Sequence, residues 1–151
     1  MLYPDRRLKE VCRPAERAEA DAVAQDLIDT MRSFPGCVGL AAPQIGELVR
    51  VAVVDCSGHP RAEDPNGLMV LVNPRLSAAD GSELGREGCL SIPDLTGNVR
   101  RAAAIEIDGR RSVGFEARCV QHELDHLDGI LFLDRVDSLA HDLFVRKVYK
   151  Q

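Results

Sequence analysis

The chain has 151 residues, of which 45% are hydrophobic and 28% charged, with a formal net charge of -5 and a pI near 5.4. This length and composition are typical of one globular domain, here residues 1–151, that buries its own core. The acidic balance argues against a protein that holds DNA on a basic surface. No apolar stretch is long enough to span a bilayer, and the first residues lack the features of a signal or transit peptide. We therefore expect a cytoplasmic protein with no DNA or membrane partner.

The cysteines are odd in number, and no two of them form a CxxC pair. This usage indicates neither a disulfide framework nor a zinc ribbon. We expect reduced thiols, as in a cytosolic compartment. A cysteine with a function should then act alone, as a metal ligand or as a nucleophile. The five cysteines are Cys12, Cys37, Cys56, Cys89 and Cys119.

The first half of the chain is predicted to form one helix followed by two strands. Apolar residues recur at helical spacing over Pro14–Ser33, and Pro35 and Gly36 end that helix. Leu48–Asp55 and Leu68–Pro74 are rich in β-branched residues, which favours strands. The residues between these two segments are polar and predict a loop.

The second half is predicted to contain further strands and two helices. A third strand is expected near Glu83–Arg86 and a fourth in Asn98–Asp108, followed by an Asp-Gly turn. The period becomes helical over Gly114–Gly129, and Ser138–Val148 is expected to form a last short helix with basic residues near its end. The expected fold class is α+β: mostly antiparallel strands packed around a buried central helix, with one helix near each end of the chain.

The sequence HELDH at 122–126 is the strongest functional signal in the chain. His122 and His126 are four residues apart, so both side chains leave one face of a helix and reach one metal ion. Glu123 is placed to take a proton from a water that the ion activates. Phe115 and Cys119 fall on the same helical stripe, which indicates a buried face rather than a solvated helix with two incidental histidines. We therefore expect a metal site.

A catalytic metal site of this kind needs a third protein ligand and an open position for water. The metzincin pattern would place that ligand where the chain has Phe132, and proteases with a later glutamate ligand are excluded because no Glu follows Glu123. Asp134, Asp137 and His141 remain candidates, although each also suits a surface position or a helix cap.

Cys89 is the candidate ligand upstream of the histidines. It follows Gly88 in the sequence GREGCLSIP at 85–93, between two strand-like segments. A thiol on a tight turn beside a dication would ionise and bind the ion. The alternative is a small buried core cysteine, an interpretation that fits Cys12, Cys56 or Cys119 better.

Three segments, in this order, resemble peptide deformylases: GLAAPQIG at 39–46, EGCLS at 87–91 and QHELDHLDG at 121–129. Weaker likeness extends over almost the whole chain. The resemblance implies a hydrolase of N-terminal protein processing in translation. Such an enzyme removes the formyl group from the formylmethionine of nascent bacterial polypeptides and releases formate.

The resemblance also implies one bound metal ion, with Cys89, His122 and His126 as its ligands. Fe²⁺ is the implied physiological ion, with Zn²⁺, Ni²⁺ or Co²⁺ as substitutes. Glu123 is then the general base and later the proton donor, while water activated at the metal attacks the formyl carbonyl. A site of one thiolate and two imidazoles does not by itself select iron among these ions.

Two donors to the developing oxyanion are implied as well, the side-chain amide of Gln44 and the backbone N–H of Leu90. The small apolar residues at 39–43 would let an extended peptide pair with this segment as an added strand. Ordinary core packing is the alternative for two of the expected substrate-binding residues, Val38 and Cys119. The expected substrate-binding residues are Val38, Gly39, Glu87 and Cys119.

Four departures from the family pattern leave the metal ligands, the base and the oxyanion donors untouched, and one of them is the absence of the strand-like segment that many members carry before YPDRRLKEV at 3–11. Cys37 stands at a position that is usually Gly, and Thr96 stands where Arg is common. The stretch between EGCLS and the HExxH motif is also short. These differences leave peptide affinity and length preference open.

Two other functions remain as alternatives. A small HExxH metallopeptidase would use the same metal and Glu123, but it would normally have a downstream His or Glu ligand. A degenerate, non-catalytic homologue that binds metal and peptide would need neither Glu123 nor Gln44. The expected partner is a formyl-methionyl nascent peptide. The basic residues at 145–151 suggest a transient contact with the ribosome. The simpler interpretation is that they are the solvated end of a helix.

Overall fold

The computed structural model describes residues 1–146 of the chain. Over these residues it combines two α-helices and nine short strands with three 3₁₀ turns. The strands form three sheets of three strands each, and every pairing between named strands is antiparallel. The predicted mixture of few helices with antiparallel strands is therefore confirmed.

The first sheet is covered by the N-terminal helix. The helix α1 spans Arg17–Ser33, and the sheet consists of β1 (Gly39–Ala41), β2 (Val51–Asp55) and β3 (Leu68–Val72), with β2 in the middle. Val51 and Val53 pack with the apolar face of α1, whereas the alternate residues of β2 belong to a second core cluster on the opposite face. Because successive side chains of a strand point to opposite faces, β2 is buried on both sides.

The second sheet has the order β4-β7-β8. Its strands are β4 (Leu76–Asp80), β7 (Ala104–Ile107) and β8 (Arg110–Val113). The predicted Asp-Gly turn joins β7 to β8, and both of its residues have positive φ, 48° at Asp108 and 79° at Gly109. Positive φ at both central residues is the conformation that a two-residue hairpin prefers, so this prediction is confirmed.

The third sheet has the order β5-β6-β9, which leaves β5 at its edge. Its strands are β5 (Glu83–Cys89), β6 (Ile92–Arg101) and β9 (Leu143–Val145). The 3₁₀ turns η1 (Arg6–Lys9) and η3 (Phe132–Asp134) contribute Leu8, Phe132 and their neighbours to a core cluster with β5 and β6. The remaining 3₁₀ turn, η2, spans Ala42–Ile45 directly after β1.

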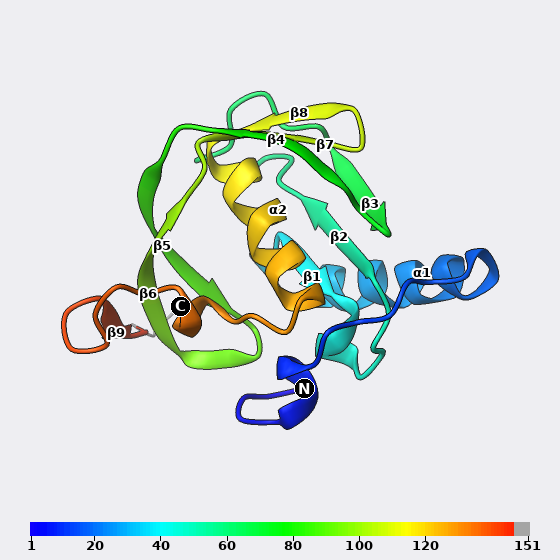
Figure 1. The fold of residues 1–151 in the computed structure, drawn as a ribbon, viewed down its shortest axis with the longest axis horizontal. Helices are drawn as coiled ribbons and strands as arrows, with labels where there is room; N and C mark the ends of the chain where they lie inside the picture. Colours follow the sequence, from blue (N-terminus) through cyan, green and yellow to red (C-terminus); the bar gives the residue numbers. More distant parts are fainter. Residues whose placement is uncertain (147–151) are drawn as a thin grey trace.

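The second helix, α2, spans Gly114–Leu127 and carries the HELDH sequence. It packs against β1 and β2 and also contacts β7 and β8. In Figure 1, α2 lies between the sheet that contains β5 and β6 and the sheet that contains β1 and β2. Gly129 follows the helix with a φ of 74°, and a Cβ at this position would collide with the backbone of Lys9. The predicted helical end at Gly129 therefore has a steric reason as well as a conformational one.

The predicted C-terminal helix over Ser138–Val148 is wrong for the residues that the structure describes; Val148 lies outside them. Residues 138–142 form a turn, in which the Asp142 N–H donates to the Ser138 carbonyl at 2.8 Å. The next three residues form β9, which pairs with β6 through Leu95↔Val145 and Gly97↔Leu143. This pairing covers one edge of β6 with β-branched and aromatic side chains, and it outweighs the local helical period.

The other strand predictions need smaller corrections. The single strand expected over Asn98–Asp108 is two strands, because the chain leaves the third sheet at Ala102 and joins the second. There the Ala103 N–H donates to the Asp80 carbonyl and the Ala102 N–H donates to Gln121 Oε1. The strand expected to continue to Pro74 ends before Asn73, which has a φ of 46°. Strands β1, β4, β8 and β9 were not predicted.

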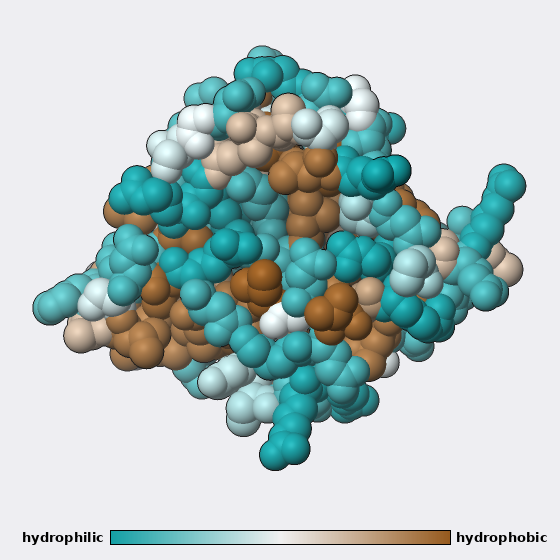
Figure 2. All heavy atoms as spheres, in the orientation of Figure 1, coloured by the Kyte–Doolittle hydropathy of each residue, from teal (hydrophilic) through white to brown (hydrophobic). Residues whose placement is uncertain are grey.

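Hydrophobic and polar surfaces are separated on the face drawn in Figure 2. Hydrophobic side chains gather where β6 and β9 lie, whereas the surface between β5 and α2 is mostly polar. Among the described residues, neither helix has the length and apolar character needed to cross a membrane. All five cysteines are free thiols, in agreement with the expected reduced state.

Candidate metal centre and active site

A cavity of about 270 Å³ lies between the edge strand β5, the segment around β1 and one face of α2. All the predicted site residues except His126 line it. His126 lies behind the wall, 1% exposed, in contact with Cys89. The cavity therefore brings together residues that are far apart in the sequence. Its predicted lining residues are Val38, Gly39, Gln44, Glu87, Cys89, Leu90, Cys119, His122 and Glu123.

The three predicted metal ligands form one cluster. One donor atom from each of Cys89, His122 and His126 lies within 4.8 Å of the others, and Cys89 Sγ is 3.3 Å from His126 Nε2. Two ligands of a tetrahedral ion, each about 2.0–2.3 Å from it, lie roughly 3.5 Å apart. The cluster has nearly this spacing. Asp134, Asp137 and His141 are not part of it.

The donor set fits a divalent metal on a further observation. Glu123 Oε2 is buried beside the cluster and has no hydrogen-bond partner among residues 1–146, as expected of a carboxylate that would face a metal-bound water. Burial lowers the pKa of His126 well below its usual value, which keeps the imidazole neutral, as a metal ligand must be. A thiolate and two neutral imidazoles suit Fe²⁺, Zn²⁺, Ni²⁺ or Co²⁺. These residues can therefore hold a metal ion.

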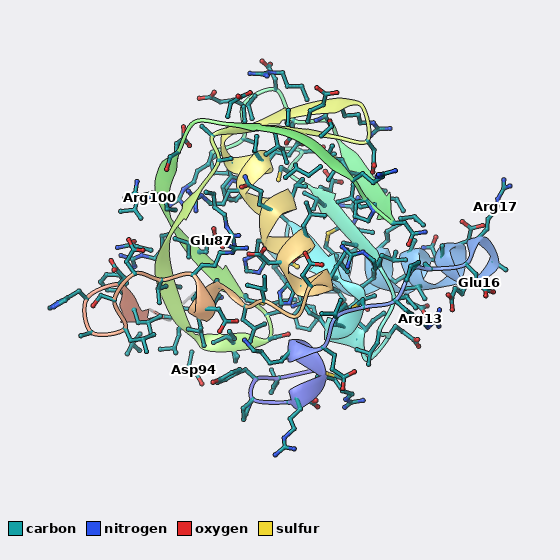
Figure 3. The ribbon with its side chains drawn as sticks, viewed as in Figure 1. Arg13, Glu16, Arg17, Glu87, Asp94 and Arg100 are labelled. Atoms are coloured by element: carbon teal, nitrogen blue, oxygen red, sulfur yellow. The ribbon has the colours of Figure 1, made fainter. Side chains whose placement is uncertain are left out.

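Glu87 acts on the histidine ligands rather than facing the empty part of the cavity. Its Oε1 lies 2.9 Å from His122 Nδ1, and Figure 3 shows its side chain pointing from β5 toward α2. Burial alone would raise the pKa of Glu87, but hydrogen bonds from His122 and Arg101 outweigh burial and hold its pKa well below the usual range. A charged Glu87 fixes His122 so that Nε2 is the nitrogen left for a metal.

Two buried arginines compensate the charge of Glu87. Arg101 donates to both carboxylate oxygens at 2.9 and 3.0 Å, and Arg118 donates to Oε2 at 2.7 Å. Arg101 also donates to Asp125, one residue before His126, and Arg135 binds the same carboxylate. This charge network joins β5, β6 and both ends of the HELDH sequence, so it holds the ligands in place from outside the cavity.

Gln44 is held in one orientation by its neighbours. Its Oε1 accepts the Ala41 N–H at 3.0 Å, and its Nε2 donates to Ser91 Oγ at 3.1 Å and lies 3.3 Å from Cys89 Sγ. The amide donor therefore points toward the metal cluster. Leu90 lines the cavity directly after Cys89.

Glu123 lies beside the cluster, with its Oε1 4.0 Å from His122 Nε2. Burial raises the pKa of Glu123 to about 7, and the nearby His122 acts in the opposite direction. A carboxyl group that exchanges its proton near neutral pH is suited to general acid and base chemistry. Gly39 leaves room for this side chain, because a Cβ at Gly39 would lie 3.2 Å from Glu123 Cγ.

The part of the cavity wall next to His122 is largely apolar. Val38, Phe115 and Cys119 line it next to His122. The neighbouring Cys56 thiol and burial raise the pKa of Cys119 well above its usual value, so it is a neutral wall residue. Burial raises the pKa of Cys37 to about 11, and this thiol donates to the Gly39 carbonyl at 3.3 Å. Cys37 is therefore neither a thiolate nucleophile nor an anionic ligand at neutral pH.

Sequence reasoning missed the groups that position the site. Glu87 is predicted from the sequence to bind substrate, and no sequence pattern indicates its contact with His122. Arg101 and Arg118 were not singled out at all, and Ser91 was only part of a motif. The one usable signal was general: a histidine that binds metal needs a partner on its other nitrogen, and the sequence places a glutamate two residues before the cysteine ligand.

Comparison with known proteins gives one consistent result. Residues 1–142 match the family model described as polypeptide deformylase. A peptide deformylase of Alkalilimnicola ehrlichii is 40% identical, with 99% of this chain and 88% of that protein aligned. The crystal structure of a peptide deformylase from Legionella pneumophila superposes with a TM-score of 0.81 at 34% identity, covering 92% of this chain and 85% of that one.

A third similar protein carries a bound peptide. It is a class I type b peptide deformylase from Acinetobacter baumannii, solved with Met-Ala-Ser, with a TM-score of 0.77 and 35% identity over 89% of this chain and 95% of that one. The family model covers nearly the whole chain, and the two structural matches cover 92% and 89% of it. The chain therefore belongs to the polypeptide deformylase family.

Proposed function

We propose that this protein removes the formyl group from the N-terminal formylmethionine of nascent polypeptides and releases formate. The single observation that supports this most is the meeting of Cys89, His122 and His126 with Glu123 and Gln44 at one cavity. A divalent ion held by the three ligands would activate water and polarise the formyl carbonyl. We further propose that residues 1–151 act as one metallohydrolase domain in which the buried helix with HExxH is the central element.

Glu123 is the proton carrier of the proposed reaction. Its carboxylate takes a proton from the attacking water and later gives it to the nitrogen of the leaving methionine. The formyl C–N bond breaks as that nitrogen receives the proton, and the two products are formate and a free amino terminus. The pKa of about 7 and the absence of a hydrogen bond to Oε2 within residues 1–146 support this role.

Gln44 and Leu90 are the proposed oxyanion donors. Attack on a formamide places negative charge on the carbonyl oxygen, and a preorganised neutral donor stabilises that charge without adding a net charge of its own. The hydrogen bonds of Gln44 to Ala41 and Ser91 support the required orientation of its Nε2. The backbone N–H of Leu90 is the second donor.

The substrate is proposed to lie as an extended peptide between β1 and β5. Both strands are at the edge of their sheets among the described residues, and the cavity lies between them. An edge strand offers free N–H and C=O groups with which a peptide backbone can pair. The methionine side chain then enters the apolar pocket beside Val38, Phe115 and Cys119. Gly39 on β1 has no side chain that would obstruct the peptide.

Iron is the proposed physiological ion. The ligand set also accepts Zn²⁺, Ni²⁺ or Co²⁺, so a metal replacement series tests this part separately. Reduced metal-free protein given Fe²⁺ without oxygen should recover the highest activity, and that activity should fade in air. Equal activity with every ion would contradict the iron assignment. A transient contact of the basic residues at 145–151 with the ribosome is proposed on their charge alone.

Formate release from a formyl-Met peptide tests the proposed reaction. Iron-loaded wild type should release formate, while Glu123→Ala should retain the metal and be almost inactive. Internal cleavage of an unformylated peptide, with no formate, would replace the proposal with a metallopeptidase. Metal and peptide binding without any turnover in the wild type would replace it with a non-catalytic role.

A further inference from the structure

The outer wall of the cavity carries two arginines that the proposed chemistry does not use. Arg86 and Arg146 both line the cavity, Arg86 from β5 and Arg146 from the residue after β9. Neither forms an ion pair among residues 1–146. The cavity has only two carboxylates among its described lining residues, Glu87 and Glu123. Glu87 is already neutralised by two other arginines, and Glu123 lies at the metal cluster.

Arg86 is held in place by neutral groups. Its Nε donates to Asn98 Oδ1 at 3.2 Å, and its Nη1 lies 3.4 Å from Thr96 Oγ1. The guanidinium carbon lies 3.6 Å from the ring centroid of Phe144. Stacking on an aromatic ring orients an arginine but leaves its positive charge uncompensated. Arg86 is therefore a fixed cation that still has free N–H donors.

Arg146 reaches across the sheet to the cavity. Its guanidinium lies against Gly88, where a Cβ would collide with it. Its Nε is buried and has no hydrogen-bond partner among the described residues. Arg146 also has no ion-pair partner among the described residues, so it adds a second uncompensated cation to the part of the cavity wall that Arg86 lines.

The two faces of β5 decide which part of a peptide would meet these arginines. Glu87 and Cys89 point to the buried face, toward α2, whereas Arg86 and Gly88 are exposed on the other face. Side chains of an extended peptide beside β5 alternate in the same way. If the methionine side chain enters the pocket next to α2, the side chain of the following residue points to the face that carries Arg86 and Arg146.

We infer that Arg86 and Arg146 form a specificity site for an acidic side chain, Asp or Glu, at the residue directly after the formylmethionine. This inference rests on the proposed function, because it assigns the substrate class of that same cavity. An exposed ion pair typically changes affinity by a factor of up to about five. Two arginines should therefore favour the acidic substrate by roughly three- to tenfold.

Turnover of matched peptides tests the inference. Formyl-Met-Glu-Ser amide and formyl-Met-Gln-Ser amide differ only in one charge, and their amide ends remove the carboxylate at the C-terminus. Wild type should show a three- to tenfold higher kcat/KM for the Glu peptide, mainly through KM, and added salt should reduce this ratio. The variant with Arg86→Gln and Arg146→Gln together should bring the ratio close to one.

Arg17→Gln is the matched control, because Arg17 is an exposed arginine on α1, far from β5 in Figure 3. This variant changes the net charge by the same amount per residue and should keep the wild-type ratio. Equal turnover of both peptides by the wild type would overturn the inference. So would a Glu preference that survives in the double variant. The free-acid form of formyl-Met-Gln-Ser can also be compared with its amide. If the wild type favours the free acid and shows no preference for Glu over Gln, the arginines bind the C-terminal carboxylate of the peptide, and the inference is wrong.

Binding of the deformylated products separates this inference from the proposed function. A relative has been crystallised with Met-Ala-Ser, so Met-Glu-Ser amide and Met-Gln-Ser amide are suitable calorimetric probes of the metal-loaded protein. Tighter binding of the Glu product, lost in the double variant, supports the specificity site even if no formate is released. Failure of formate release from both substrates would reject the deformylase reaction, while equal binding of both products would reject the specificity site.

Discussion

Oε1 of Glu87 lies 2.9 Å from Nδ1 of His122, so a buried carboxylate decides which imidazole nitrogen faces the metal cluster. Glu87 stands two residues before Cys89 on the same face of β5. One strand therefore supplies both a proposed metal ligand and the group that orients a second proposed ligand on another element. Two buried arginines keep this carboxylate charged, and Glu87 in turn offsets much of their cost of burial.

Glu87→Gln should weaken metal binding and destabilise the protein. The glutamine has nearly the same shape, but it cannot neutralise Arg101 and Arg118, and it orients His122 less firmly. Loss of such a partner typically lowers metal affinity about 10- to 100-fold. Leaving a buried charge unpaired typically costs about 3–5 kcal/mol, although the remaining contacts with Asp125 reduce this here. Chelator competition and urea unfolding of the metal-free protein measure the two effects.

Glu83→Gln is the control for this variant. Glu83 is exposed on the same strand, and only its backbone carbonyl contacts Arg118. Its substitution should leave both metal affinity and the unfolding midpoint unchanged. Wild-type metal affinity in Glu87→Gln would show that His122 is oriented by other means.

Gly39→Ala should lower turnover while the metal stays bound. The added Cβ would lie 3.2–3.3 Å from three atoms of the Glu123 side chain, so the carboxylate must move. A displacement of about 1 Å at a reacting group can cost on the order of 100-fold in rate, so the shift of a few tenths of an ångström required here should cost less than that. Stopped-time formate assays give kcat, and metal analysis of the same sample checks the site. A variant with unchanged kcat would mean that Glu123 adapts without loss.

Gln44→Glu should reduce kcat by about 100-fold or more. The substitution keeps an acceptor for the Ala41 N–H but removes the donor that faces the metal cluster, and it adds a negative charge where the oxyanion would form. Ser91→Ala removes only one partner of Gln44 Nε2 and should cause a smaller loss. If Gln44→Glu retained wild-type kcat, the oxyanion role of Gln44 would be wrong.

The sequence predicts the parts of this molecule that depend on local patterns. The helix over Gly114–Gly129 has a helical apolar period, and its observed bounds are close to the predicted ones. The Asp-Gly hairpin turn needs only its own two residues. The strands β2 and β3 are short apolar segments that contain several valines, which identify them without knowledge of their partners.

Long-range pairings and charge networks could not be read in this way. Leu143–Val145 become a strand because β6 offers an edge, and nothing in those residues alone says so. The ion pairs of Glu87 form only because the fold brings β5, β6 and α2 next to one another. The same holds for Arg86 and Arg146, whose placement beside Gly88 follows from the position of β9. Sequence patterns therefore locate the proposed reacting groups, while the residues that orient them emerge only from the fold.

The burial of Glu123 should make the metal-free protein less stable as the pH rises. Its pKa is about 7 in the folded state, against 4.5 for an ordinary glutamate. Between these two values the unfolded chain has released its proton while the folded chain keeps it, so the folded state binds more protons and stability falls with rising pH.

Glu123→Gln removes this titration and gives a direct measurement. Metal-free Glu123→Gln and wild type should differ little in unfolding free energy at pH 4.5, and the variant should become more stable by on the order of 3 kcal/mol above pH 7. Urea unfolding with chelator and reductant, repeated from pH 4.5 to pH 8, gives the curve for each protein. A difference that stays constant over this range would mean that Glu123 is ionised throughout. The difference in unfolding free energy between the two proteins would then arise from packing rather than from the charge of Glu123.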